Sequence, residues 1–196
     1  MDEALTNPIK PQKTLLRRSL LSQRQSLSTE AWRYRSDRLC EHLQNSTLFA
    51  QSQTILAYFS IRQEVDLSPL FTYPKRWGFP RCVEKTLFWH LWSPTDALPL
   101  QAGKYGILEP DSAAVSIAPD EVDLVLVPAI ACDMRGYRLG YGGGFYDRLL
   151  SSPPWVAKPT IGIVFEFARL PELPIDDWDC PLQAVCTEAG LFPVPQ

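Results

Sequence analysis

The stretch from residue 122 to residue 150 constrains this chain more than any other part of its sequence. It opens with a mostly apolar run, residues 122–127, which predicts a buried strand ended by Pro128. It closes with residues 145–150, which predict the first turns of a helix. Half of the chain's ten glycines lie between these two elements, at Gly136, Gly140, Gly142, Gly143 and Gly144. Such a cluster costs backbone entropy, so it indicates positive φ angles or a close approach of the backbone to another group.

A glycine-rich turn between a strand and a helix presents free backbone N–H groups, which are a means of binding phosphate. Two better-known patterns are excluded. The Walker pattern needs a Lys followed by Ser or Thr after the glycines, and the dinucleotide pattern needs a third glycine where Phe145 or Asp147 stands. A glycine-rich hairpin without a ligand stays an alternative. Arg138, Asp147 and Arg148 favour the ligand site, because their charges suit phosphate and metal ions.

A longer motif surrounds these glycines. Residues 133–148 have the pattern Asp-x-x-Gly-x-Arg-Leu-Gly-Tyr-Gly-Gly-Gly-Phe-Tyr-Asp-Arg, which closely resembles the signature of the 5-formyltetrahydrofolate cyclo-ligase family. Three other segments resemble elements of the same family: residues 13–17 (Lys-Thr-Leu-Leu-Arg), residues 60–64 (Ser-x-x-x-Glu) and residues 178–182 (Trp-Asp-x-x-Leu). The resemblance runs from Lys13 to about Thr187. The sequence departs from the usual family pattern at Cys132, Ala168 and Trp178.

The resemblance implies an ATP site in the first helix and the glycine loop, made of Lys13, Thr14, Leu15, Leu16, Arg17, Arg138, Leu139, Gly140, Tyr141, Gly142, Gly143, Gly144, Phe145 and Tyr146. It implies a folate site made of Arg17, Phe59, Glu64, Tyr141, Gly142, Gly143, Gly144 and Phe145. Lys13, Arg17 and Arg138 would offset phosphate charge, and Asp147 and Asp179 would hold Mg²⁺. Glu64 would accept two hydrogen bonds from the pterin, although an exposed loop carboxylate is its alternative interpretation.

The activity that this resemblance implies is an ATP- and Mg²⁺-dependent cyclisation of 5-formyltetrahydrofolate to 5,10-methenyltetrahydrofolate. ADP and phosphate are released, after phosphorylation of the formyl oxygen and attack by N10. Two other classes stay open: a non-catalytic folate- or nucleotide-binding module, and a sugar-phosphate isomerase that uses Glu64 or Asp147 as a base. The two carboxylates assigned to Mg²⁺ disfavour the module, and the paired cations Lys13 and Arg17 favour the ligase over the isomerase.

The order of the predicted elements indicates the fold class. Helices are predicted over residues 12–27 and from an N-cap at Ser28 to about Asn45. Apolar runs predict strands at residues 54–59, 77–81, 86–92, 122–127, 160–165 and 184–187. We expect residues 1–196 to form a single α/β domain with three α/β/α layers and a largely parallel central sheet. The resemblance implies a Rossmann-like fold of the sugar-phosphate isomerase and CoA-transferase group.

Composition limits the partners of this chain. A formal net charge of −3 argues against a dedicated nucleic-acid binder. The five cysteines are odd in number and include no Cys-x-x-Cys, which favours the reduced thiols of a cytoplasmic protein. The N-terminal residues 1–11 lack the apolar core of a signal peptide, and no run reaches membrane-spanning length. We expect a cytoplasmic monomer that binds 5-formyltetrahydrofolate and ATP, and neither nucleic acid nor membrane.

Overall fold

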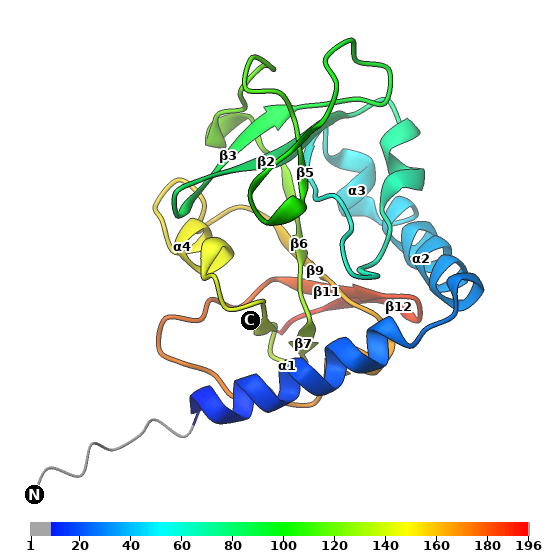
Figure 1. The fold of residues 1–196 in the computed structure, drawn as a ribbon, viewed down its shortest axis with the longest axis vertical. Coiled ribbons are helices and arrows are strands. Elements are labelled where there is room, and N and C mark those ends of the chain that lie inside the picture. Colours follow the sequence, from blue (N-terminus) through cyan, green and yellow to red (C-terminus); the bar gives the residue numbers. More distant parts are fainter. Residues whose placement is uncertain (1–8, 196) are drawn as a thin grey trace, which may run out of the picture.

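The computed structural model describes residues 9–195, and a seven-stranded sheet forms its centre (Figure 1). The strand order is β12-β11-β9-β6-β1-β2-β3. In chain order the strands are β1 (Thr54–Leu56), β2 (Arg76–Val83), β3 (Thr86–Leu91), β6 (Leu124–Pro128), β9 (Thr160–Ile163), β11 (Ala184–Thr187) and β12 (Gly190–Pro193). Strands β2, β1, β6, β9 and β11 run parallel, while β3 and β12 are antiparallel edges. The predicted α/β fold with a largely parallel sheet is confirmed.

Four α-helices surround this sheet, and smaller elements lie at its ends. The helices are α1 (Ile9–Gln25), α2 (Thr29–Gln44), α3 (Thr47–Gln51) and α4 (Phe145–Leu150). The smaller strands are β4 (Gln101–Ala102), β5 (Leu108–Glu109), β7 (Ala131–Asp133), β8 (Arg138–Leu139) and β10 (Arg169–Leu170). The 3₁₀ turns are η1 (Ser68–Thr72), η2 (Lys104–Gly106), η3 (Pro119–Glu121) and η4 (Glu166–Ala168). In Figure 1, α2 and α3 lie on the side of the molecule opposite to α4, and α1 runs along its lower edge beneath β7.

The two faces of the central sheet are both buried. Leu124 and Leu126 of β6 pack in one hydrophobic cluster with residues of α2 and α3. Val125 and Val127, which alternate with them, pack in a second cluster with residues of α1 and α4. Because successive side chains of a strand point to opposite faces, burial of both faces requires the continuous apolar run that the sequence contains. The two clusters divide the fold into the three layers that were expected.

The helix boundaries differ slightly from the prediction at the N-terminal end. Helix α1 begins at Ile9 rather than at residue 12, since Pro11 lies in the first turn, where its missing N–H is not needed. It ends at Gln25, two residues before the predicted end. The predicted N-cap of α2 is confirmed, because Ser28 Oγ accepts a hydrogen bond from the Ala31 N–H at 3.1 Å. Residues 1–8, part of the segment predicted to lack signal-peptide character, lie outside the described residues.

Several strands are shorter than their apolar runs or were not predicted. Strand β1 ends at Leu56, because the chain leaves the ladder and Phe59 stacks on Phe79 with ring centroids 4.2 Å apart. Strand β9 likewise ends at Ile163, and β6 is displaced to Leu124–Pro128. The run 184–187 is β11, but it is not the last strand, since β12 follows it after a tight turn. The β7–β8 hairpin was missed; Gly136 at its turn has φ 87°.

Two further features concern the whole described chain. Within residues 9–195, no helix has both the length and the apolar character that crossing a membrane would require. All five cysteines are free thiols, and three of them (Cys40, Cys132 and Cys186) are buried.

Candidate active site

The C-terminal half of α1 lies at the ends of two neighbouring parallel strands. Arg24 Nε donates to the carbonyl of Arg62 at 3.1 Å, in the loop that follows β1. Its Nη1 donates to the carbonyl of Ala129 at 3.5 Å, directly after β6. Ligands of open α/β sheets bind outside the carboxyl ends of the strands. The Glu64 loop begins at this edge, and Arg24 Nη2 also donates to the hydroxyl of Tyr141 in the glycine loop, so both loops of the predicted site contact the same residue there.

Glycine is needed for different structural reasons at different positions of the loop between β8 and α4. Gly142 has φ 96° and Gly144 has φ 64°, in the region that residues with a side chain rarely adopt. Gly143 has no positive φ; a Cβ there would lie 2.9 Å from the ring of Phe145. Positive φ and close approach, the two explanations offered for the glycine cluster, both occur in it.

The backbone N–H groups of this loop, residues 140–144, have no acceptor in the described part of the chain, residues 9–195. Residues 141–143 are exposed, and residues 140 and 144 are partly exposed. Successive backbone N–H groups that have no protein acceptor can form an anion-binding concavity. The loop therefore offers phosphate oxygens several hydrogen-bond donors at once.

Two arginines lie directly beside these donors. Arg17 Nε donates to the carbonyl of Gly140 at 2.7 Å, which brings α1 onto the loop. Arg138 Nη2 lies 2.8 Å from Asp147 Oδ1, and the Arg138 side chain is only 5% exposed. Its Nε is buried and finds no acceptor within the described residues. A Cβ on Gly140 would lie 2.7 Å from Arg138 Nη1, so glycine at position 140 makes room for the guanidinium.

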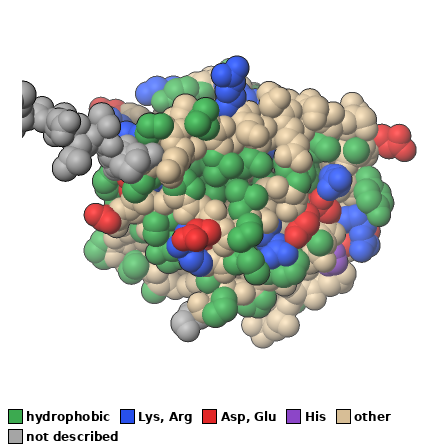
Figure 2. All heavy atoms as spheres, turned by 90° about the horizontal axis from the view of Figure 1, so that it is seen from below, with side chains coloured by type: hydrophobic (Ala, Val, Ile, Leu, Met, Phe, Trp, Pro, Cys, Tyr) green, Lys and Arg blue, Asp and Glu red, His purple; other side chains and the backbone are tan. Residues whose placement is uncertain are grey.

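Lys13 is held between two carboxylates of the loop that precedes β11. Its Nζ lies 2.7 Å from Asp176 Oδ2, and it also forms an ion pair with Asp179. Burial, the largest single effect, lowers the pKa of Lys13, but the hydrogen bonds and charges of the two aspartates outweigh it and raise the pKa above its ordinary value. Lys13 is therefore a fixed, buried cation. On the face shown in Figure 2, acidic and basic side chains lie interspersed.

The two predicted magnesium ligands lie on neighbouring segments. Cys180 Sγ donates to the carbonyl of Asp147 at 4.0 Å, which places the residue after Asp179 against the start of α4. Asp147 Oδ2 and Asp179 Oδ1 accept no hydrogen bond within the described residues, so each carboxylate keeps one oxygen for a cation. Residues 9–195 contain no cluster of three or more metal-binding side chains. Two hard oxygen ligands suit Mg²⁺, which takes its remaining ligands from water and substrate phosphates.

Glu64 is buried rather than exposed, so its alternative interpretation as an exposed loop carboxylate is wrong. The residue is 4% exposed, and its Oε2 accepts from the Ile61 N–H at 3.2 Å. Trp32 Nε1 donates to its carbonyl at 2.7 Å. Burial raises the pKa of the Glu64 carboxyl, while the charge of the nearby Arg24 and the hydrogen bond from the Ile61 N–H act in the opposite direction. A buried carboxylate with so few donors of its own is well suited to accept hydrogen bonds from a ligand.

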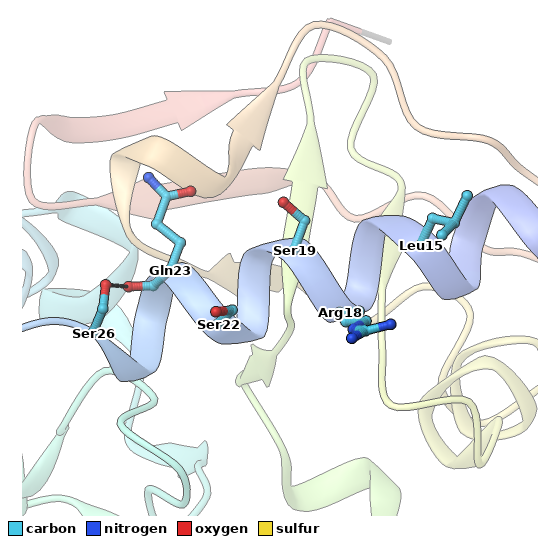
Figure 3. Close-up of a pocket in the computed structure, with 6 residues that line it drawn as sticks. All are labelled: Leu15, Arg18, Ser19, Ser22, Gln23 and Ser26. Carbon is cyan, nitrogen blue, oxygen red and sulfur yellow. Dashed lines mark hydrogen bonds between the residues drawn. The ribbon is translucent and has the colours of Figure 1, made fainter.

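The structure does not bring every predicted residue to the glycine loop. Leu15 is 68% exposed and lines, with Arg18, an open hollow of about 530 Å³ on the solvent side of α1 (Figure 3). Thr14 is exposed as well, and its hydroxyl donates to the carbonyl of Lys10 at 2.9 Å. Leu16 packs against the hydrophobic core. Within the predicted segment 13–17, only the two cations contact the loops of the site.

The remaining predicted residues support the loop from beneath. Leu139 is buried, and Tyr146 lies under Arg138, whose Cζ is 5.3 Å from the centroid of its ring. Phe145 is half-buried at the start of α4. Phe59 belongs to an aromatic cluster at the end of β1 together with Phe79. These side chains hold the loop and the strand end in place.

Comparison with known proteins identifies the group to which this arrangement belongs. The sequence profile of the 5-formyltetrahydrofolate cyclo-ligase family matches residues 9–188, nearly the whole described chain. The chain belongs to the 5-formyltetrahydrofolate cyclo-ligase family. The resemblance found in the glycine motif and the prediction of an enzyme of this family are thereby confirmed.

Individual members of the cyclo-ligase family show the extent of the likeness. The chain is 29% identical to the 5-formyltetrahydrofolate cyclo-ligase of Escherichia coli strain K12 over 150 residues, which cover 72% of this chain and 81% of the relative. A match to the Haemophilus influenzae cyclo-ligase is 38% identical over 87 residues, but it covers only 43% of this chain and 46% of the relative. The structure of Aquifex aeolicus 5,10-methenyltetrahydrofolate synthetase is 33% identical, with a TM-score of 0.82 over 94% of this chain and 93% of the other.

Two residues near the candidate site were missed by sequence reasoning. Arg24 was not among the predicted site residues, although it is 4% exposed and contacts both loops. Asp176, the partner of Lys13, stands in the acidic segment Asp-Asp-Trp-Asp, where nothing local marks one carboxylate as buried. The only available signal for Arg24 was its position in the last turn of an amphipathic helix.

Proposed function

We propose that this chain cyclises 5-formyltetrahydrofolate to 5,10-methenyltetrahydrofolate and converts ATP to ADP and phosphate in the same reaction. The cyclo-ligase family and the names of its members support the folate reaction. The observation that carries the nucleotide part is the run of unpaired N–H groups at residues 140–144, which lies between Arg17 and Arg138. Donors and cations in this arrangement match the oxygens of a polyphosphate.

This reaction does not require the protein to form a covalent bond to either substrate. The formyl oxygen of the substrate is a poor leaving group until it attacks the γ-phosphorus of ATP, which breaks the bond to ADP. N10 then attacks the formyl carbon and gives up its proton, and phosphate departs with the former formyl oxygen. Such a reaction needs the two substrates to be positioned in line and the phosphate charge to be offset.

The residues of the site divide these tasks between them. The glycine-loop N–H groups would hold the phosphate oxygens, while Arg17, Arg138 and Lys13 would offset their charge. Glu64 would accept hydrogen bonds from the amino group and the adjacent ring N–H of the pterin, and would so orient the formyl group. Positioning by a buried side chain is favourable, because the packing around it restricts its motion.

Asp147 and Asp179 would hold Mg²⁺, with the one free oxygen that each carboxylate keeps. The ion would supply charge neutralisation at the phosphates of ATP. The contact between Cys180 Sγ and the carbonyl of Asp147 supports this proposal, because it brings the segment of Asp179 against the start of α4.

A single assay tests this function. The purified protein is incubated with 5-formyltetrahydrofolate, ATP and Mg²⁺, while the near-ultraviolet absorbance of the methenyl product is followed. We expect product only when all three are present, and no product after chelation of the metal. Binding of both ligands without any product would contradict the proposal and favour a binding module.

A matched pair of variants connects the activity to the site. Arg17→Gln removes a cation that contacts the glycine loop, and Arg18→Gln removes its exposed neighbour on the same helix. We expect the first variant to raise KM for ATP and lower turnover, and the second to behave as the unaltered enzyme. Equal kinetics of the two variants would remove Arg17 from the site.

A further inference from the structure

One buried side chain of α1 connects the two loops of the site. Arg24 is 4% exposed, and its three donor groups contact three separate segments. Nε donates to the carbonyl of Arg62 at 3.1 Å in the Glu64 loop, and Nη1 to the carbonyl of Ala129 at 3.5 Å after β6. Nη2 donates to the hydroxyl of Tyr141 in the glycine loop. A buried guanidinium that is satisfied in this way fixes the relative position of its acceptors.

The loop that carries Glu64 needs such support, because its backbone is strained. Arg62 has φ 48° and Gln63 has φ 56°, so two successive residues with side chains adopt the left-handed region. Strain of this kind persists only where the surroundings hold it in place, and it is concentrated at functional sites. Arg24 holds the first of these residues by its carbonyl, and Trp32 Nε1 holds the carbonyl of Glu64 at 2.7 Å.

Tyr141 completes the connection between the loops. Its hydroxyl oxygen accepts a hydrogen bond from Arg24, and the hydroxyl lies near enough to the Glu64 carboxylate for the charge of Glu64 to act on its pKa. Burial raises the pKa of Tyr141 to about 12, so it remains a donor at neutral pH. The Cζ atoms of Arg24 and Arg62 lie 5.8 Å and 5.7 Å from the centroid of its ring. The residue is nevertheless 40% exposed, so part of it stays accessible to a ligand.

We propose that Arg24 is a positioning residue that couples the folate site to the nucleotide site through Tyr141. It holds the turn that carries Glu64 and one residue of the glycine loop in a single network. A ligand that immobilises one of these loops therefore removes part of the ordering cost for a ligand at the other, and the two ligands strengthen each other's binding. This inference rests on the proposed function, which supplies the two ligands; Arg24 itself contacts neither of them.

The coupling is measured by calorimetric titration of ADP, with and without saturating 5-formyltetrahydrofolate. For the unaltered protein we expect ADP to bind at least about fivefold more tightly when folate is present. Tyr141→Phe removes only the hydroxyl, and we expect the ratio of the two affinities to fall to about one. Tyr73→Phe is its matched control: that hydroxyl contacts Gln44 Oε1 at 2.6 Å, away from both loops, and its loss should leave the ratio unchanged.

Variants of Arg24 test the same network from α1. We expect Arg24→Gln to abolish the ratio, Arg24→Lys to restore part of it, and Arg18→Gln, on the solvent side of the same helix, to preserve it (Figure 3). A merely structural role would lower the melting temperature and both affinities together, and would leave the ratio as it was. A folded Tyr141→Phe or Arg24→Gln variant with an unchanged ratio overturns the inference.

Failure of the coupling is distinguishable from failure of the proposed function. An unaltered protein that forms no methenyl product overturns the function, and the inference with it. An unaltered protein that turns over, but binds ADP equally well with and without folate, overturns the coupling alone.

Discussion

Arg138 Nη2 lies 2.8 Å from Asp147 Oδ1, so a cation predicted to bind phosphate and a carboxylate predicted to bind Mg²⁺ neutralise each other. Lys13 and Asp179 form a second pair of the same kind. A buried charge that loses its partner is costly, whereas an exchange of partners is not. ATP carries negative charge and Mg²⁺ carries positive charge. When both bind as the proposed function requires, Arg138 and Lys13 would exchange their carboxylate partners for phosphate, and Asp147 and Asp179 would exchange their cationic partners for Mg²⁺.

The first prediction concerns this exchange at Asp147. The Asp147→Asn variant keeps the shape of the side chain but is a poor ligand for a hard cation. We expect turnover to fall roughly 100-fold and the Mg²⁺ requirement to rise, while folate affinity is retained. We also expect a lower melting temperature, because Arg138 loses its carboxylate partner. Turnover across a Mg²⁺ titration checks this, and near-normal turnover at ordinary Mg²⁺ would remove Asp147 from the site.

The second prediction concerns Asp176, which holds Lys13 at 2.7 Å. Loss of one of the two carboxylates leaves Lys13 with more unneutralised charge for phosphate. We expect Asp176→Asn to bind ADP roughly threefold to tenfold more tightly and to melt at a lower temperature. Asp177→Asn is the matched control, since that neighbour is exposed and the change of net charge is the same. Weaker ADP binding by Asp176→Asn would instead mean that Asp176 orients Lys13.

The third prediction concerns the pH dependence of stability at Glu64. Burial raises the pKa of Glu64 above its ordinary value of 4.5, so the folded protein binds this proton more tightly than the unfolded chain does. The stability that results is present below pH 4.5 and is lost as pH rises through the folded pKa. A Gln at this position does not ionise. We therefore expect Glu64→Gln to melt at a higher temperature than the unaltered protein near neutral pH, with the difference vanishing in acid.

Glu64→Gln should have the opposite effect on function. The amide can accept only part of the paired hydrogen bonding that the carboxylate offers to a pterin, and the loss of a charged partner costs roughly 1.5–3 kcal/mol. We expect KM for the folate to rise about tenfold or more, and KM for ATP to change little. An unchanged KM for the folate, in a variant with the predicted stability profile, would leave Glu64 a buried structural carboxylate.

The fourth prediction concerns the backbone of the glycine loop. Gly142 has φ 96°, and a Cβ at this position would approach no atom more closely than 3.8 Å. Alanine therefore fits sterically but strains the backbone. We expect Gly142→Ala to weaken ADP binding more than folate binding. Gly106→Ala is the matched control, because Gly106 has φ 71° and open space around it. Equal ADP affinity in both variants would contradict the role of the loop as a phosphate cradle.

Local patterns predicted the elements of this fold well. Ser28 caps α2 as its side chain requires, and the continuous apolar run of β6 is buried on both faces of the sheet. A helix cap depends on a few neighbouring residues, and the burial of a strand can be predicted from the pattern of its apolar residues. The strand ends were less predictable. Strand β1 ends at Leu56 because Phe59 finds a stacking partner in Phe79, which is twenty positions further along the chain.

The sequence by itself determined the family, the largely parallel α/β architecture and the glycine loop, because a motif and a hydrophobic period each involve residues that are close together in the chain. Only the tertiary structure decided that Glu64 is buried, that Asp176 holds Lys13, and that Arg24 contacts both loops. These relations join residues up to 163 positions apart. The burial of a charged side chain depends on which distant segment packs over it, and the packing of α1 across the ends of β1 and β6 brings those segments together.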